Sequence, residues 1–222
     1  MTTTGTRDIV AELARYSTSA LSDALDRLGI EGQALGIKPL DREFRLAGRA
    51  FTGLYQPVGA AGGTVGDYID DVPPGSVVVL DNRGRMDATV WGDILTAVAH
   101  RRGLAGTVID GVCRDSARAL EVGYPLFTRG STMRTGKDRV TLAAVDVPVT
   151  VGEVVVHPGD ILIGDADGIV VVPASSEDEV LEAATAIEEA EDRIRAAVES
   201  GERLDEARRR LAYHSLQTRI DA

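Results

Sequence analysis

The middle of the chain alternates between continuous hydrophobic runs and amphipathic segments. The run SVVVLD at 76–81 has only apolar residues between its ends, which is typical of a strand buried on both faces. Apolar residues at helical spacing follow each such run, and Gly103 and Gly123 end the two helical patterns. In chain order, the predicted elements are a strand at 76–81, a loop at 82–85, a helix at 92–102, a strand at 107–110 and a helix at 115–122. This order predicts a parallel pair of strands with a right-handed crossover, so both strands should end at one edge of a sheet.

The segments on either side of this unit follow other patterns. Helices are predicted at 6–16 and 19–28, where Ser19 is the expected N-cap of the second helix and Gly29 ends it. The segment 46–56 looks extended, and the glycine-rich segment 58–69 fits either a helix or a loop. Further strands are predicted at 145–149, 154–156, 161–163 and 168–172, with a turn at 157–160.

The C-terminal part is charged and amphipathic. It predicts helices at 175–199 and 203–213, with a break at Gly201. Neither an internal repeat nor a low-complexity linker separates these segments. We therefore predict a single α/β domain at 1–174 that carries a C-terminal helical arm at 175–222.

The composition excludes several classes of protein. A chain of 222 residues that is 44% hydrophobic can bury one large core. A net charge of −11 without a block of Lys and Arg argues against nucleic acid, because such binding depends on neutralising phosphates. The single cysteine excludes an intrachain disulfide and fits a reducing compartment. The N-terminus lacks a signal-peptide pattern and no apolar run is long enough to span a membrane, so we expect a soluble, cytoplasmic protein.

Three charged residues stand where the predicted strands end. Asp93 opens the helix after the first strand, and the pair Arg114-Asp115 follows the second strand after an interval of twenty residues. Two carboxylates offer hard oxygen ligands for a divalent cation, and a guanidinium offers a planar fork for an anionic oxo acid. The free amides at the helix start, those of Gly92, Asp93, Ile94 and Leu95, form a further anion site.

Each of these residues also has a purely structural interpretation. Asp93 can stabilise the first turn of its own helix, Asp115 can be the N-cap of the next helix, and Arg114 can be a surface ion-pair partner that contributes little. Taken singly, the structural interpretation is the better one. Capping does not require three such residues to converge on one sheet edge, however, so their joint placement favours a ligand site.

Four segments together carry a resemblance to a known family. They are STSALSDALDRLG at 17–29, WGDIL at 91–95, GLAGTVIDGVCRD at 103–115 and HPGDILIGDADGIVVVP at 157–173. Their order and spacing resemble the class II 4-hydroxy-4-methyl-2-oxoglutarate aldolases and the related regulator of ribonuclease activity A. The likeness spans roughly 17–197, and the Asp–twenty residues–Arg–Asp arrangement is its specific part.

The resemblance implies a swivelling β/β/α-type fold that assembles as homotrimers or homohexamers with active sites between subunits. It implies a divalent cation, Mg²⁺ or Mn²⁺, and a small oxo-acid substrate. The implied reaction is cleavage of 4-hydroxy-2-oxo acids to pyruvate, with decarboxylation of oxaloacetate as a second activity.

The resemblance also assigns roles by position. Arg114 would contact the pyruvyl oxygen, Asp115 would hold the metal and Asp93 would add a second carboxylate to its water shell. The amides of residues 92–95 would bind the pyruvyl carboxylate. A glutamate from a neighbour's C-terminal helix would complete the site; Glu191 fits best and Glu188 next, although the family often has Lys or Arg before this glutamate and this chain has Ala190.

The alternative implied by the same resemblance is a non-catalytic regulator that binds a ribonuclease or a helicase. Members of that kind tend to lack the full motif, which this chain has, so the enzyme is favoured. The physiological substrate stays open. Arg83 or Arg85 in the predicted loop would suit a distal carboxylate, or would be solvated loop charges.

Overall fold

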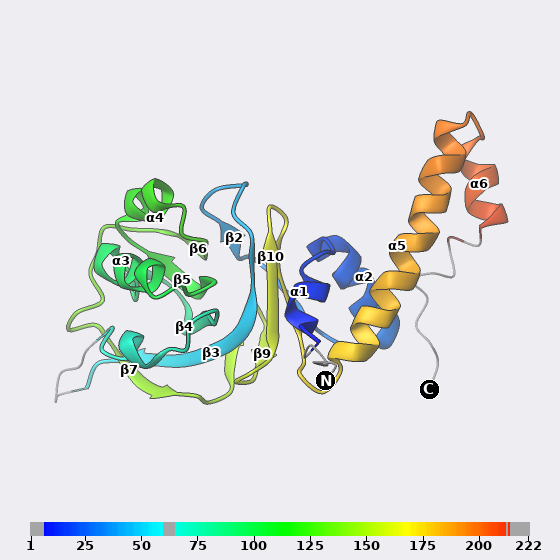
Figure 1. Ribbon diagram of the computed structural model, residues 1–222. Coiled ribbons are helices and arrows are strands. Elements are labelled where there is room, and N and C mark those ends of the chain that lie inside the picture. Colours follow the sequence, from blue (N-terminus) through cyan, green and yellow to red (C-terminus); the bar gives the residue numbers. More distant parts are fainter. Residues whose placement is uncertain (1–6, 60–64, 212, 214–222) are drawn as a thin grey trace, which may run out of the picture.

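The computed structural model describes residues 7–59, 65–211 and 213, and it contains a mixed α/β fold (Figure 1). The strands are β1 Gln33–Ala34, β2 Lys38–Pro39, β3 Leu46–Pro57, β4 Val77–Thr89, β5 Gly106–Cys113, β6 Leu126–Ser131, β7 Val140–Val145, β8 Val149–Val151, β9 Val154–Val156, β10 Ile161–Asp165 and β11 Gly168–Val172. The helices are α1 Ile9–Leu13, α2 Thr18–Leu28, α3 Asp93–Arg101, α4 Ser116–Val122, α5 Glu177–Glu199 and α6 Leu204–Arg210, with a 3-10 turn η1 at Ile69–Asp71.

Nine strands form one strongly bent sheet in the order β1-β11-β10-β3-β4-β5-β6-β2, with β7 paired to β3. The central strands β3, β4, β5 and β6 are parallel, as predicted for the strand–helix–strand unit, and their flanks are antiparallel. The two ends of this path, β1 and β2, follow one another in the chain. Lys38 on β2 donates to the backbone carbonyl of Asp167 in the β10–β11 turn, so the sheet nearly closes on itself.

The hydrophobic run on β4 is buried on both faces, as its sequence predicts. Val77 and Val79 pack into the interior of the bent sheet, beside the β8–β9 hairpin. Val78 and Leu80 belong to the core on the other face, where α3 and α4 cover the sheet. Because side chains alternate along a strand, one continuous apolar run supplies both cores. Full burial of each such side chain stabilises the fold by about 1.5–3 kcal/mol.

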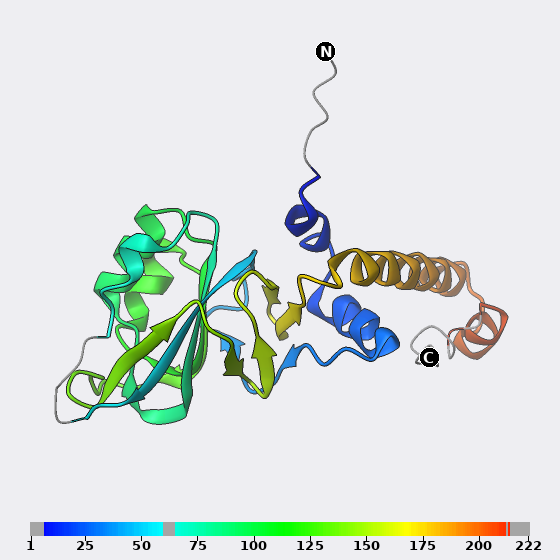
Figure 2. The ribbon, with the colours of Figure 1, turned by 90° about the horizontal axis from the view of Figure 1, so that it is seen from below.

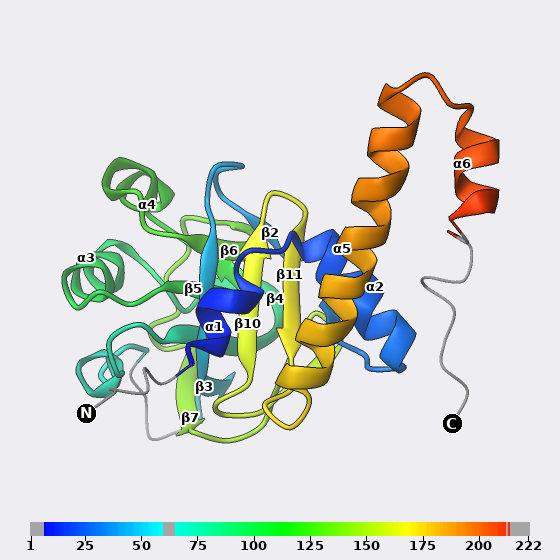
Figure 3. The ribbon, with the colours of Figure 1, turned by 45° about the vertical axis from the view of Figure 1, so that its right-hand side comes forward.

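The terminal helices form a third core on the opposite side from α3 and α4 (Figure 2). Leu21 and Leu25 of α2 and Val180 and Ile187 of α5 pack against the outer faces of β10 and β11. The later part of α5 extends beyond the sheet, and α6 runs back alongside that part of α5 (Figure 3). The predicted helices at 175–199 and 203–213 thus correspond to α5 and α6, although residue 212 lies outside the described residues.

Several boundaries differ from the prediction for identifiable reasons. The N-cap of α2 is Ser17, not Ser19, because the Ser17 hydroxyl accepts from the amide of Ala20 at 3.1 Å. The predicted start of the first helix at Thr6 lies outside the described residues, and α1 begins at Ile9 with Asp8 as its cap. The segment 58–69, which fitted a helix or a loop, is partly outside them, at 60–64.

Two predictions around strands are wrong. The loop predicted at 82–85 is part of β4, which continues to Thr89 through two bulges opposite β5. Positive backbone φ angles at Arg83 and Gly84 mark this irregular stretch, which is why its sequence resembled a loop. The strand predicted at 145–149 is also wrong, because β7 ends at Val145 and β8 begins only at Val149. The described residues hold no helix that is long and apolar enough to cross a membrane.

Candidate functional site

The ends of β4 and β5 bring the predicted residues together. The backbone amide of Arg114 donates to the carbonyl of Trp91 at 2.9 Å, which joins the two chain segments just beyond their strands. Gly92 and Asp93 on one segment therefore lie beside Arg114 and Asp115 on the other. The convergence expected from the strand–helix–strand pattern is present, whereas the roles assigned to these residues stay predictions.

The start of α3 is bound by carboxylates of the chain itself. Gly92 is the N-cap and offers no side chain, so the amides of the first turn need other acceptors. Asp93 accepts from the amide of Ile94 through its own Oδ1 at 2.8 Å. The amide of Asp93 donates to Oδ2 of Asp115 at 3.4 Å, and the same oxygen lies 3.2 Å from Nε of Arg114.

Asp115 reaches α3 because of its unusual backbone. It is the N-cap of α4 but adopts the left-handed conformation, with φ 52° and ψ 35°, and its side chain makes no capping bond to α4. A non-glycine residue in this region is uncommon, and such residues gather at functional sites. The capping interpretation of Asp115 therefore holds for its backbone position only, since its carboxylate serves the neighbouring helix.

Glycine at position 92 leaves room for this close approach. A Cβ there would lie 3.0 Å from Oδ2 of Asp115 and 3.3 Å from Nε of Arg114. The backbone of Gly92 is extended, with φ −149° and ψ −167°, so the restriction is the neighbouring side chains and not the backbone conformation.

A small cavity of about 140 Å³ opens at this point. It is lined by residues 89–95 at the β4–α3 junction, by Arg114, and by Val65, Thr135 and Gly136. The side chains of Arg114 and Asp115 are 40% and 43% exposed, so a ligand can reach them. Ile94 on the rim is 74% exposed, which is unusual for a large apolar side chain at the mouth of a polar cavity.

Buried groups beneath the cavity hold this arrangement in place. The Trp91 indole donates to the hydroxyl of Thr96, which donates in turn to the carbonyl of Gly92 at 3.0 Å. The Trp91 ring stacks on Tyr124 with 6.2 Å between ring centroids. Cys113 is buried, and burial raises the pKa of its thiol to about 11, so it is neutral and not a nucleophile at physiological pH.

One wall of the cavity was not identified from the sequence. Thr135 and Gly136 belong to the segment between β6 and β7, which is tied to β4 by a bond from the amide of Thr89 to the carbonyl of Arg134. A Cβ at Gly136 would lie 2.0 Å from the carbonyl oxygen of Thr89, so only glycine permits this contact. The isolated Gly136 in a polar stretch was the available signal.

The other predicted residues do not join the site within one chain. Glu188 and Glu191 lie on α5, on the far side of the sheet from α3 and α4 (Figure 1). Both are ion-paired to Arg195, at 2.9 and 3.1 Å. Arg85 is paired with Asp87 at 2.9 Å, and neither Arg83 nor Arg85 lines the cavity.

The donor set at the cavity fits a cation that keeps part of its water shell. Among the residues that the structure describes, no group of three or more His, Cys, Asp or Glu side chains is placed to hold a metal. Asp93 lines the cavity, and the Asp115 carboxylate lies next to it, beside Arg114. Mg²⁺ commonly binds through one or two carboxylates and retains several waters. The chain's own residues are therefore compatible with Mg²⁺ or Mn²⁺, with fewer ligands than a structural metal cage needs.

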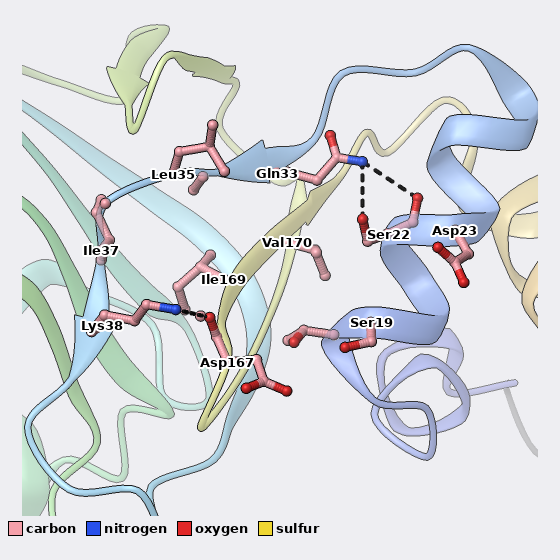
Figure 4. Close-up of a pocket in the computed structure, with 14 residues that line it drawn as sticks. Ser19, Ser22, Asp23, Gln33, Leu35, Ile37, Lys38, Asp167, Ile169 and Val170 are labelled. Atoms are coloured by element: carbon pink, nitrogen blue, oxygen red, sulfur yellow. Dashed lines mark hydrogen bonds between the residues drawn. The ribbon is translucent and has the colours of Figure 1, made fainter.

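A second cavity, of about 350 Å³, lies between α2 and the β1–β2 and β10–β11 segments (Figure 4). Its prominent polar groups already bind other parts of the chain. The amide nitrogen of Gln33 donates to Ser22 and Asp26, and the Lys38 ammonium donates to the carbonyl of Asp167. The Gln33 bonds hold α2 against β1, and the Lys38 bond joins β2 to the β10–β11 turn, so these groups have structural roles.

Fold and site together define a mixed α/β protein with an arginine and two carboxylates at a helix start. A model of the RraA-like family, described as aldolase/RraA, matches residues 18–171. The chain belongs to this family, as its motifs suggested, and the predicted α/β domain with a C-terminal helical arm agrees with structures of family members.

Two proteins with similar sequences cover most of this chain. Protein DlpA of Legionella pneumophila is 40% identical over 209 residues, which are 93% of this chain but 34% of DlpA. The chain thus spans about a third of the length of that relative. A putative 4-hydroxy-4-methyl-2-oxoglutarate aldolase of Halalkalibacterium halodurans is 33% identical over 177 residues, 80% of this chain and 82% of that protein.

Solved structures show the same fold. An uncharacterized protein of Pseudomonas syringae pv. tomato matches with a TM-score of 0.83 and 46% identity, over 90% of this chain and 96% of that one. Streptomyces coelicolor RraAS2, described as an unusual member of the RNase ES inhibitor RraA family, matches with a TM-score of 0.78 and 33% identity, over 85% of this chain and 96% of that one.

Proposed function

We propose that the protein is a divalent-metal-dependent lyase that cleaves 4-hydroxy-2-oxo acids to pyruvate and also decarboxylates oxaloacetate. The observation that carries the proposal is that Arg114 and the start of α3 line one cavity, with the Asp115 carboxylate in contact with both. Similarity to a putative 4-hydroxy-4-methyl-2-oxoglutarate aldolase supports the same reaction class.

The proposed role of each residue in the site follows from its charge. The amides of residues 92–95 bind the carboxylate of the oxo acid, because a helix start presents N–H groups that have no partner within the helix and a positive dipole end. Arg114 lies against the 2-oxo oxygen, where negative charge collects as the enolate of pyruvate forms. Loss of one such donor typically lowers the rate by about 10²–10³. Asp115 and Asp93 would hold a divalent cation, which when bound supplies Lewis-acid polarisation of the 2-oxo group.

One enolate serves both reactions. Cleavage of the C3–C4 bond of a 4-hydroxy-2-oxo acid passes the proton of the 4-hydroxyl to water and leaves a carbonyl at C4. The electrons of the broken bond enter the pyruvate enolate, which water then protonates at C3 to give pyruvate. Oxaloacetate reaches the same enolate when carbon dioxide leaves. The groups that stabilise the enolate oxygen therefore stabilise both transition states.

The assembly is part of the proposal. We assign residues 1–174 to the catalytic domain and 175–222 to an arm that contacts other subunits in a homotrimer or homohexamer. Glu191, or Glu188, would reach a neighbouring cavity in that assembly. Both glutamates would first have to exchange their ion pair with Arg195 for contacts in the neighbour.

The proposal is tested by pyruvate release from oxaloacetate and from 4-hydroxy-4-methyl-2-oxoglutarate. Activity should require Mg²⁺ or Mn²⁺ and stop with EDTA. Arg114→Ala should lower kcat/KM by about 10²-fold or more while the circular dichroism spectrum is unchanged. Glu121→Gln, on the exposed end of α4, is the matched control and should be as active as wild type. Full activity of Arg114→Ala would reject the site.

The second candidate is a regulator that binds a ribonuclease or a helicase, and the similarity to RraAS2 favours it. Such a protein needs an intact surface and no turnover. Stoichiometric binding of a purified ribonuclease, together with no pyruvate release under any metal condition, would establish this candidate over the lyase.

A further inference from the structure

We propose that the Asp115 carboxylate is a built-in competitor for the anion site at the start of α3, and that an oxo-acid carboxylate binds there only after Asp115 has left. The inference rests on the proposed function to the extent that the α3 amides are the carboxylate site. It adds a role for Asp115 in the order of binding.

Asp115 uses the same donors that a ligand carboxylate needs. Its Oδ2 accepts from the amide of Asp93 at 3.4 Å and lies 3.2 Å from Nε of Arg114. A helix-start amide and an adjacent guanidinium are the standard partners of a bound carboxylate. An external carboxylate at this place would therefore meet a like charge already in its position.

The local backbone directs the carboxylate to this place. The left-handed conformation of Asp115 turns its side chain away from α4, which has no side-chain cap at its start. The absence of a side chain at Gly92 leaves the room that the carboxylate occupies. Asp115 thereby gives up the capping bond that aspartate ordinarily makes at such a position and contacts α3.

The contact is suited to exchange. At 3.4 Å the bond to the Asp93 amide is longer than the usual range of 2.7–3.2 Å, and the Asp115 side chain is 43% exposed. Departure of the Asp115 carboxylate therefore breaks one weak hydrogen bond and one solvent-exposed ion pair with Arg114, and it buries no charge. A divalent cation in the cavity would give the Asp115 carboxylate another partner. Binding of the metal and binding of the oxo-acid carboxylate should therefore strengthen one another.

The test is the binding of pyruvate by the full-length chain in EDTA, measured by calorimetry. Asp115→Ala should bind pyruvate about tenfold more tightly than wild type, or better, because the substitution frees the amide and removes a like charge. Asp115→Asn keeps the shape of the side chain without its charge, and its affinity should fall between the two. Glu121→Gln removes one negative charge from the far end of the same helix and should leave the affinity unchanged.

The fluorescence of Trp91, the only tryptophan, reports whether each variant keeps its fold, because this ring is buried beneath the site. Equal or weaker binding of pyruvate by folded Asp115→Ala and Asp115→Asn would overturn the inference, since Asp115 would then only support Arg114 and α3. That result leaves the lyase proposal intact if wild type releases pyruvate. If the variants bind pyruvate more tightly but wild type shows no turnover, the proposed lyase function is rejected, whereas the role of Asp115 as a competitor for the anion site is retained.

Discussion

Substitution of Asp110 by Ala should destabilise the fold strongly, because the carboxylate is buried and has two partners. Its side chain, on β5, is 8% exposed and is ion-paired to Nε of Arg129. Its other oxygen accepts from the amide of Gly152 at 3.3 Å, at the turn of the β8–β9 hairpin. Removal leaves a guanidinium and a buried amide without these acceptors.

The expected size follows from these two losses. Breaking a buried ion pair on one side costs about 3–5 kcal/mol, but Arg129 is 27% exposed and water can partly solvate it. We therefore expect Asp110→Ala to lower the free energy of unfolding by about 2–4 kcal/mol. Asp87→Ala is the matched control, because Asp87 is 54% exposed and its surface pair with Arg85 should contribute little to stability.

Urea unfolding followed by circular dichroism measures both changes, at one protein concentration so that any association is held constant. A double-mutant cycle with Arg129→Ala should give a coupling energy of about 1 kcal/mol or more between the two side chains. A loss below about 1 kcal/mol for Asp110→Ala, or a coupling energy near zero, would refute the reasoning, because the pair would then behave like a surface pair.

Three further predictions concern other parts of the fold. Burial raises the pKa of Asp165, but hydrogen bonds from the amide and hydroxyl of Thr18 outweigh burial and hold the pKa below 3.8. The ionised carboxylate therefore stabilises the fold above pH 3.8, and this stability is lost as the pH falls through the folded pKa. Urea unfolding between about pH 3 and pH 6 should show a steeper loss of stability towards acid in wild type than in Asp165→Asn, and equal slopes would contradict this. The Cys113 thiol, with its pKa raised to about 11 by burial, should react with a disulfide reagent at about pH 8 only after unfolding; rapid reaction of the folded protein would disprove it. Gly136→Ala should lower stability by about 1–3 kcal/mol because its Cβ would lie 2.0 Å from the Thr89 carbonyl, and an unchanged urea midpoint would show that the segment can move away.

The sequence predicted the parts of the fold in which one pattern has one structural meaning. A short apolar run of valines such as 76–81 favours a strand between two cores, and the placement of Val77 and Val78 in different cores confirms it. The helices α3 and α4 end beside Gly103 and Gly123 as expected, since a left-handed glycine stops a helix locally. The continuation of β4 through residues 82–89 was missed because it depends on pairing with β5, a contact distant in sequence.

The candidate site was predictable in position but not in its contacts. Strand ends in a parallel pair meet at one edge, which is enough to bring Asp93 near Arg114 and Asp115. The partner of each carboxylate could not be inferred, because capping rules place Asp115 on its own helix and the structure places its carboxylate on α3. That choice depends on a left-handed residue and on the room left by Gly92.

The two irregular stretches of β4 explain how the start of α3 comes to lie beside Arg114 and Asp115. Between the pairs Asp81–Asp110 and Thr89–Val112, β4 advances by eight residues while β5 advances by two. The extra residues of β4 include Arg85 and Asp87, which pair with each other near the surface, and Thr89 again pairs with Val112 close to the ends of both strands. With a regular register instead of these shifts, the eight residues would carry the chain past the end of β5, and α3 would start beyond Arg114 and Asp115. The stretch that reads as a loop in the sequence is therefore the feature that brings the start of α3 to the arginine and the carboxylate.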